Sequence, residues 1–186
     1  AGEAFDKVAK LLGLGYPGGP FIEKYAKAAG FKDYFKYPRT KNKSKSFDFS
    51  FSGLKTAVLY DLVKRGAFDL KTGIEKEKLN LEMQQKVASS FVACVADVFK
   101  SKLKFCFNEY PEIQGATFVG GVACNQYLRD VLKNYCDSRE KYFVVPPVKF
   151  CGDNAAMVAF VGGYKHEKGE FDSLELDVLG KCVLNN

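Results

Sequence analysis

The sequence has no tryptophan, a single histidine and no apolar run near the ~20 residues that a membrane-spanning helix needs. The lone His166 excludes any site that requires two histidines from this chain. Six cysteines are present, but none forms a CxxC pair or a zinc-ribbon pattern, and most lie in apolar or helical runs. We therefore expect reduced thiols inside a cell and no membrane segment.

The composition is that of a soluble globular protein, because 47% of the 186 residues are hydrophobic and 27% are charged. The chain begins Ala-Gly-Glu on a helical pattern, without an initiator Met, so we expect a piece of a longer protein or an expressed fragment. The net charge of +6 gathers in a stretch without acids. That stretch either follows RNA phosphates or is a solvated flexible loop. Its basic residues are Lys36, Arg39, Lys41, Lys43 and Lys45.

Hydrophobic periodicity predicts alternating helices and short strands, which indicates an α/β fold. Residues 31–46 are expected to form a loop or edge hairpin, 67–78 a charged connector and 167–186 a tail. The predicted helices cover 2–14, 21–30, about 54–65, 79–110 (as one helix or two continuous ones), a segment starting at Asn125, and 154–165; the predicted strands cover 47–51, 116–119 and 142–145.

The stretch GATFVGGVACNQYLRD, residues 115–130, combines a strand, a glycine turn and a helix start. Gly120 and Gly121 end the strand, and Asn125 occupies the expected N-cap of the helix. This arrangement can bring backbone N–H groups against a phosphate or a nucleoside. Taken without its wider context, the same pattern is more often an ordinary turn between a strand and a helix.

Three other features allow a functional and a purely structural interpretation. Asp6 falls off the apolar stripe of its helix and is free to face a cleft or solvent. The breakers in the predicted loop of residues 14–20 leave Gly18 and Gly19 bare, which suits a flat sugar or base but also suits a plain turn. Ser52 and Asp153 are both natural N-caps for the helices that follow them.

The string GGVACNQYLR resembles the GGVAxNxxLR signature of the TsaD/Qri7 family (the glycoprotease or Kae/Gcp type), which installs threonylcarbamoyl on tRNA adenosine. Three more stretches match in the family's order: residues 1–20, residues 49–58 and residues 151–159, where CGDNAAMVA is similar to CTDNAAMIA. The form FSFSGLKTAV resembles the bacterial and mitochondrial branch. Together the four motifs are spread over nearly the whole chain.

The resemblance implies the second lobe of the actin-like, sugar-kinase-like ATPase (ASKHA) superfold, with residues 1–186 forming the C-terminal lobe of a two-lobe protein. It implies that Asp153 is a ligand of iron or zinc whose histidine ligands lie outside this chain. It also implies threonylcarbamoyl-AMP as substrate, and tRNA, nucleotide (AMP or ATP) and subunits of a modification complex as partners. The implied nucleotide-binding residues are Asp6, Gly18, Gly19, Glu23, Gly120, Gly121 and Asn125.

By this resemblance the chain is the C-terminal part of a tRNA threonylcarbamoyltransferase, cytoplasmic or mitochondrial, and inactive alone. No nucleophile set is apparent and no catalytic side chain is assigned, in keeping with direct transfer. A metallopeptidase and a non-enzymatic nucleotide-binding scaffold are the alternatives. Two departures from the family pattern are Cys124, where a small residue is usual, and Gly152, where Thr is common.

Overall fold

The computed structural model describes residues 1–39, 46–75 and 77–177. The chain divides into two compact units, Ala1–Gly152 and Asp153–Asn186. Within the described residues, no helix combines the length and the apolar character needed to cross a membrane. The cysteines described are free thiols, namely Cys94, Cys106, Cys124, Cys136 and Cys151.

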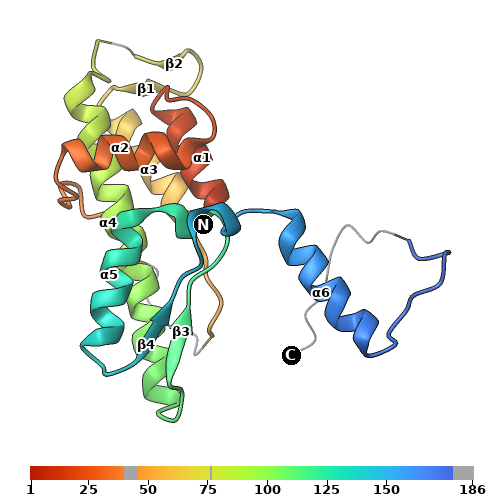
Figure 1. Cartoon of the computed structure of the whole chain (residues 1–186). Coiled ribbons are helices and arrows are strands. Elements are labelled where there is room, and N and C mark those ends of the chain that lie inside the picture. The colour runs from red at the N-terminus through yellow and green to blue at the C-terminus, as the bar shows by residue number, and fades with distance from the viewer. Residues whose placement is uncertain (40–45, 76, 178–186) are drawn as a thin grey trace. The chain divides into compact units, whose positions relative to one another are not determined.

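Helices dominate both units, and the strands are short (Figure 1). The helices are α1 (Gly2–Leu11), α2 (Gly18–Ala28), α3 (Ser52–Lys64), α4 (Leu81–Glu109), α5 (Gln126–Asp137) and α6 (Ala155–Glu167). The strands are β1 (Phe68–Asp69), β2 (Gly73–Ile74), β3 (Gly115–Thr117) and β4 (Tyr142–Val144), with short 3-10 helices η1 (Gly121–Cys124) and η2 (Val148–Phe150).

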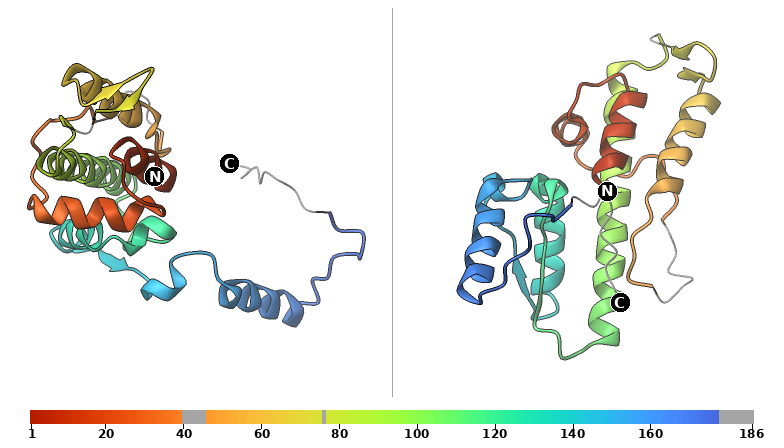
Figure 2. Two further views of the ribbon diagram at one scale, coloured as in Figure 1. Left: turned by 90° about the horizontal axis from the view of Figure 1, so that it is seen from above. Right: turned by 90° about the vertical axis from the view of Figure 1, so that its right-hand side faces the viewer.

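Helix α4 is the element on which the first unit is built. It is one continuous helix of 29 residues, as predicted, and Asn80 caps it by accepting a hydrogen bond from the Met83 N–H at 2.9 Å. The first half of α4 is enclosed by α1, α2 and α3, while α5 runs beside the second half (Figures 1 and 2). Phe91 is fully buried there and meets Phe5 of α1 edge to face at 4.9 Å. The sequence pattern thus predicted the main core helix correctly.

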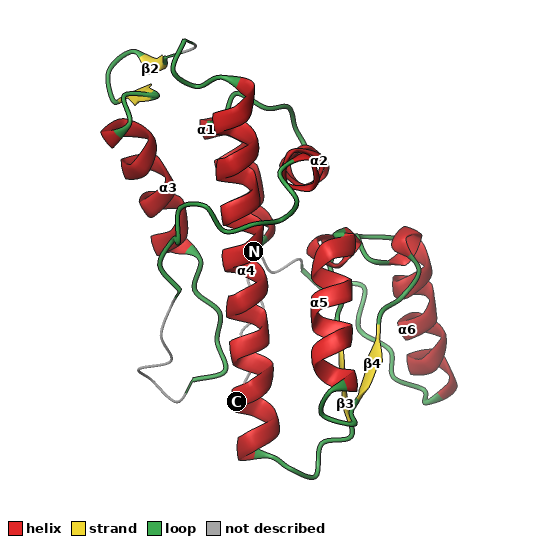
Figure 3. Ribbon diagram, turned by 90° about the vertical axis from the view of Figure 1, so that its left-hand side faces the viewer, coloured by secondary structure: helices red, strands yellow, loops and turns green. Residues whose placement is uncertain are grey.

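Strand β3, helix α5 and strand β4 form a parallel β-α-β unit (Figure 3). The register pairs Gly115 with Tyr142 and Thr117 with Val144. Both strands were predicted, and each is shorter at its carboxyl end than the apolar run suggested. This unit confirms the α/β class. The antiparallel hairpin of β1 and β2 lies in the predicted connector and was missed, because each strand has only two residues.

The predicted strand at 47–51 is wrong, since these residues pair with no strand among those described. Their alternating phenylalanines pack on α4 instead. Phe49 and Phe51 both contact the ring of Phe99, at 5.0 and 5.8 Å between centroids. Alternation places side chains on one face, but a helix surface satisfies that face as well as a sheet does. Ser52 is the first residue of α3 rather than its N-cap, which is Phe51.

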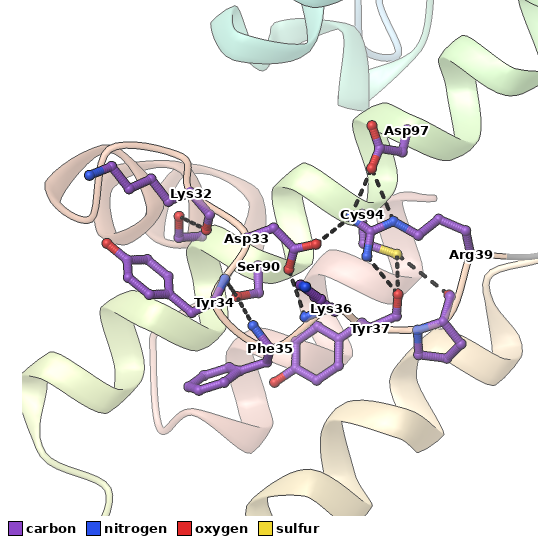
Figure 4. A network of polar contacts seen from close by, with 12 residues as sticks. Lys32, Asp33, Tyr34, Phe35, Lys36, Tyr37, Arg39, Ser90, Cys94 and Asp97 are labelled. Atoms are coloured by element: carbon purple, nitrogen blue, oxygen red, sulfur yellow. Dashed lines mark hydrogen bonds and ion pairs between the residues drawn. The ribbon is translucent and has the colours of Figure 1, made fainter.

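The loop after α2 is fixed to α4 by polar contacts (Figure 4). The hydroxyl oxygen of Ser90 on α4 accepts from the backbone N–H groups of Tyr34 and Phe35, at 2.9 and 3.1 Å. Arg39 pairs with Asp33 of the same loop at 2.6 Å and with Asp97 of α4 at 2.7 Å. These contacts hold the loop against the helix without regular secondary structure.

This network bears on the predicted basic stretch. The charge of Arg39 is neutralised by two carboxylates, so this residue holds the loop against α4 and offers little charge to an RNA phosphate. Lys36 is exposed, and its backbone N–H donates to Asp33 while its side chain stays accessible. The other three lysines of the stretch, Lys41, Lys43 and Lys45, lie outside the described residues.

Cys94 of α4 lies beside this network. Burial raises the pKa of its thiol to about 11, so this cysteine stays protonated at neutral pH.

In the second unit, α6 begins one residue later than the pattern suggested. Its N-cap is Asn154, whose side-chain oxygen accepts from the Met157 N–H at 3.0 Å. The prediction that Asp153 caps this helix is therefore wrong. Because two adjacent residues can each cap, the chain's local geometry decides between them, and Asp153 is left exposed beside the cap.

Candidate nucleotide site

A cavity of about 1000 Å³ opens in the first unit. Its lining comes from α1, α2, α4, α5, β3, β4, η1 and the segment before α3. Part of the lining is a chain of aromatic rings in which Phe99 contacts Phe49 and Phe118. The polar part brings together six of the seven predicted nucleotide-binding residues, which are Asp6, Gly19, Glu23, Gly120, Gly121 and Asn125.

The seventh residue, Gly18, has a structural role at the start of α2. A Cβ added to Gly18 would lie 2.7 Å from the Cβ of Ala9 and 2.8 Å from the Cα of Asp6. Its N–H donates to Oδ1 of Asp6 at 2.7 Å. Gly18 is therefore required by the close packing of α1 and α2, and it is not among the residues that line the cavity.

The predicted loop of residues 14–20 is shorter than expected, because α2 already begins at Gly18. Gly18, Gly19 and Pro20 form its first turn. A proline is tolerated there because the first N–H groups of a helix have no intrahelical partner. Gly19 has open space where a Cβ would stand, so its backbone is accessible from the cavity.

The two polar atoms of the Asn125 side chain are in different situations at the start of α5. Its side-chain oxygen accepts from the Leu128 N–H at 2.9 Å, which confirms the predicted N-cap. Only 6% of the residue is exposed, and its side-chain nitrogen is buried without a hydrogen-bond partner. Leaving such a donor unpaired costs about 1–3 kcal/mol, so an acceptor supplied by a ligand would be favoured here.

The glycine turn before Asn125 depends on a left-handed residue. Gly120 has a φ of 86°, which side chains with a Cβ rarely adopt. Space is open around the Cβ positions of both Gly120 and Gly121. The turn therefore presents bare backbone to the cavity at the N-terminal end of α5, where the helix dipole favours negative charge.

Glu23 connects α2 to the start of α5. Its Oε1 accepts from the N–H groups of Gln126 and Tyr127, at 2.7 and 3.4 Å. A carboxylate at this position satisfies two free donors of the helix and complements its dipole. The sequence did not indicate this contact, because the partners are separated by more than a hundred residues.

No activated thiol lies in the polar part of the lining. Burial raises the pKa of the Cys124 thiol, and the neighbouring Cys151 raises it further. Cys124 therefore remains a neutral thiol at pH 7 and is a poor nucleophile. The polar lining thus includes two carboxylates, an amide, a hydroxyl, the amine of Lys102 and exposed backbone, a set of groups that can bind a ligand.

The model of one family matches residues 1–160, and its description is "TsaD: tRNA N6-adenosine threonylcarbamoyltransferase". The chain belongs to the TsaD family. Among curated relatives with that enzyme name, one from Thermosipho africanus is 44% identical over 91% of this chain and 47% of its own length. A relative from Clostridium botulinum is 38% identical over 99% of this chain and 51% of its own length. The chain therefore spans about half the length of the curated relatives it matches.

Membership of the TsaD family confirms the resemblance carried by the four motifs. The family match includes the cavity-lining residues and also Asp153, which lies in the second unit. Those relatives are named as transferases and not as peptidases, so the metallopeptidase alternative is not favoured.

The described residues contain no group of three or more His, Cys, Asp or Glu side chains placed to hold a metal ion. His166 lies on α6 and packs edge to face on Phe171, at 5.5 Å between ring centroids. Asp153 therefore belongs to no such group among the described residues of this TsaD chain.

Sequence reasoning missed the aromatic part of the cavity. Phe47 and Phe49 line it, yet their alternation was interpreted as a strand. Lys102 and Cys106 of α4 also line the cavity, although the helical periodicity of α4 did not mark them as site residues. The available signal was the density of phenylalanine, 17 residues in all, of which several face one hollow.

Proposed function

We propose that this chain is the C-terminal part of a tRNA N6-adenosine threonylcarbamoyltransferase, and that its cavity binds the AMP portion of threonylcarbamoyl-AMP. The observation that carries the proposal is Asn125. Its oxygen is committed to capping α5, while its buried nitrogen lacks a partner beside the glycine turn. A nucleotide acceptor atom would satisfy that donor.

Each part of the polar lining suits one part of a nucleotide. The Gly120–Gly121 turn and the N-terminal end of α5 suit the phosphate, because backbone N–H groups and the helix dipole favour an anion. Asp6 and Glu23 suit the ribose, since carboxylates accept hydrogen bonds from vicinal hydroxyls. One oxygen of each is already engaged with a helix start, which fixes the carboxylate in place. Gly19 leaves room for the sugar beside them.

The proposed reaction is direct transfer. The N6 amine of the tRNA adenosine attacks the carbonyl carbon of the donor, a C–N bond forms, and the bond from that carbon to the AMP phosphate oxygen breaks. The residues of this chain hold the departing AMP and orient the donor, which is catalysis by positioning. No side chain of the polar lining needs to become covalently attached.

Asp153 is proposed as one oxygen ligand of an iron or zinc ion. The described residues do not by themselves fit a metal site of ordinary coordination, because none of them form a group of three or more His, Cys, Asp or Glu side chains that could hold an ion. The remaining ligands would come from residues outside this chain, and no step of the transfer is assigned to the ion.

The broader setting is part of the same proposal. The chain would form the second lobe of an ASKHA-type protein, with tRNA and subunits of a modification complex as partners, in the cytoplasm or in mitochondria. The separate chain should not transfer threonylcarbamoyl to unmodified tRNA, because half of the relatives' length is not in it. Transfer by this chain at the rate of a full-length relative would contradict that expectation.

The decisive experiment uses Asn125→Ser in the full-length protein, numbered as in this chain. Serine keeps an oxygen that caps a helix but removes the side-chain N–H donors. We expect AMP binding to weaken by about 1–3 kcal/mol, measured by calorimetry, with little change in stability. The control is Asn134→Ala at an exposed position on the same helix. Wild-type affinity in Asn125→Ser would overturn the proposed site.

A further inference from the structure

Arg129 is a feature of α5 to which neither the motifs nor the cavity gave a role. Its guanidinium contacts two separate segments of the first unit. Nε donates to the carbonyl of Ala123 in η1. Nη2 lies 3.3 Å from the carbonyl of Pro146 and 3.2 Å from Sγ of Cys151. One side chain thus joins the turn before Asn125 to the segment after β4.

The helix geometry explains why Arg129 reaches this place. Arg129 lies one turn beyond the N-cap, and its backbone N–H donates to the Asn125 carbonyl at 3.2 Å. Side chains on a helix point back toward its N-terminus, so the guanidinium is directed at the turn that precedes the helix. Among the ion pairs of the described residues, none involves Arg129. Its acceptors are uncharged, so an ordinary surface ion pair does not account for it.

Only a guanidinium can make this set of contacts. It is a rigid planar fork with five N–H donors, whereas a lysine ammonium is a single point with flexible reach. The two joined segments also meet through Cys124, whose thiol lies 3.9 Å from the Val148 carbonyl. Cys124 also hydrogen-bonds with Cys151, but thiol contacts of this kind are weak. Arg129 adds charged N–H donors to the carbonyls of Ala123 and Pro146.

We propose that Arg129 is a positioning residue of the nucleotide site, in which its guanidinium holds the Gly120–Asn125 turn against the 146–151 segment. This inference rests on the proposed function. By fixing the Ala123 carbonyl, Arg129 holds the backbone two residues before Asn125, and so the Asn125 amide is already in place before a nucleotide arrives. Pre-organisation of this kind increases affinity because less ordering is needed on binding.

The test compares Arg129→Lys and Arg129→Gln in the full-length protein, with AMP as the probe in calorimetry. Lysine keeps the positive charge but loses the fork, and we expect both variants to bind AMP about tenfold more weakly. If Arg129 acted only through its charge, Arg129→Lys would bind like the wild type, and that result would overturn the proposal. Arg139→Gln is the matched control, because Arg139 is exposed and its guanidinium donates to the side chain of Asn108, away from the cavity lining.

A chemical rescue separates positioning from general stability. In Arg129→Ala, added ethylguanidinium should restore AMP affinity, while ethylammonium at the same concentration should not. Binding is measured well below the unfolding midpoint, so that a loss of stability alone would leave the affinity of the folded protein unchanged. The inference would be contradicted if Arg129→Ala bound AMP with unchanged affinity, or if ethylguanidinium and ethylammonium restored the affinity equally.

Failure of this inference differs from failure of the proposed function. If the wild-type protein does not bind AMP, or if Asn125→Ser binds it normally, then the proposed site itself is wrong. If Asn125→Ser loses affinity while the Arg129 variants keep it, only the role of Arg129 is wrong.

Discussion

The helices α5 and α6 both begin at an asparagine cap, yet their surroundings differ. In each case the asparagine oxygen accepts from the third residue of the helix, Leu128 at 2.9 Å and Met157 at 3.0 Å. The start of α5 also receives a carboxylate from another helix, Glu23 of α2. At α6 the acid is the adjacent Asp153, which does not cap the helix.

Like α5, and unlike α6, helix α2 has a carboxylate from another helix at its start, because its first N–H group donates to Asp6 of α1. In the first unit, therefore, each acid proposed to bind a ribose also completes the start of another helix. These acids stabilise the fold and line the cavity at once. Among the described residues, Asp153 caps no helix, so the ligand role proposed for it would not compete with capping. The difference indicates that substitutions should affect stability and binding together at Asp6 and Glu23, but activity alone at Asp153.

The largest effect is expected for Asp153→Asn in the full-length protein. Because Asn154 caps α6, the substitution should leave stability within about 0.5 kcal/mol of the wild type. If Asp153 is a metal ligand, metal affinity should fall by about tenfold or more, and the transfer rate should fall with it. Mass-spectrometric metal analysis and a tRNA modification assay measure the two quantities. Asp172→Asn is the control, and equal metal occupancy in Asp153→Asn would end the ligand hypothesis.

The next largest effect concerns the neighbouring glycines at the start of α2. Gly18→Ala should lower the free energy of unfolding by about 1–3 kcal/mol, because the new methyl group would overlap Ala9 and the α1 backbone. Gly19→Ala enters open space and should cost no stability, but it should weaken AMP binding by narrowing the cavity. Urea unfolding and calorimetry distinguish the two. Equal stability of both variants would show that α1 and α2 are not in close contact at Gly18.

A smaller effect separates the two asparagine caps. Asn125→Ala and Asn154→Ala each remove a capping oxygen and should each cost about 1 kcal/mol of stability. Only Asn125→Ala should also weaken AMP binding, since only Asn125 lines the cavity with an unpaired buried donor. Thermal unfolding with and without AMP tests this. A stabilisation by AMP that is the same in Asn125→Ala as in the wild type would remove the distinction.

The smallest effect is expected for Glu23→Gln, which keeps an acceptor at the start of α5 but removes its charge. The lost interaction with the helix dipole should cost about 0.3–1 kcal/mol at low salt and less at high salt, because ions screen it. Unfolding measured at two ionic strengths gives this difference, with the exposed Glu112→Gln as control. A cost that does not depend on salt would show that Glu23 acts through hydrogen-bond geometry and not through charge.

Local patterns were sufficient where a short segment decides its own structure. The unbroken apolar period of residues 79–110 predicted α4, and the order strand, Gly-Gly, Asn predicted the cap of α5. The residues that meet in the cavity were identified by the resemblance of the four motifs to the family, and not by such local patterns. Patterns failed where two local solutions had similar energy. The phenylalanines of 47–51 fit a strand or a helix-packed loop, and Asp153 and Asn154 could each have capped α6.

By itself, the sequence determined the alternation of helices and short strands, because helix periods, glycine turns and caps act over a few residues. Its four motifs matched the family, and that resemblance marked six residues that line the cavity. Only the tertiary structure decided what those residues touch. It assigned Gly18 to packing, placed Glu23 at the start of α5, and joined Arg129 to the segment after β4. These contacts link residues far apart along the chain, and they depend on how buried surfaces pack, which no local pattern contains.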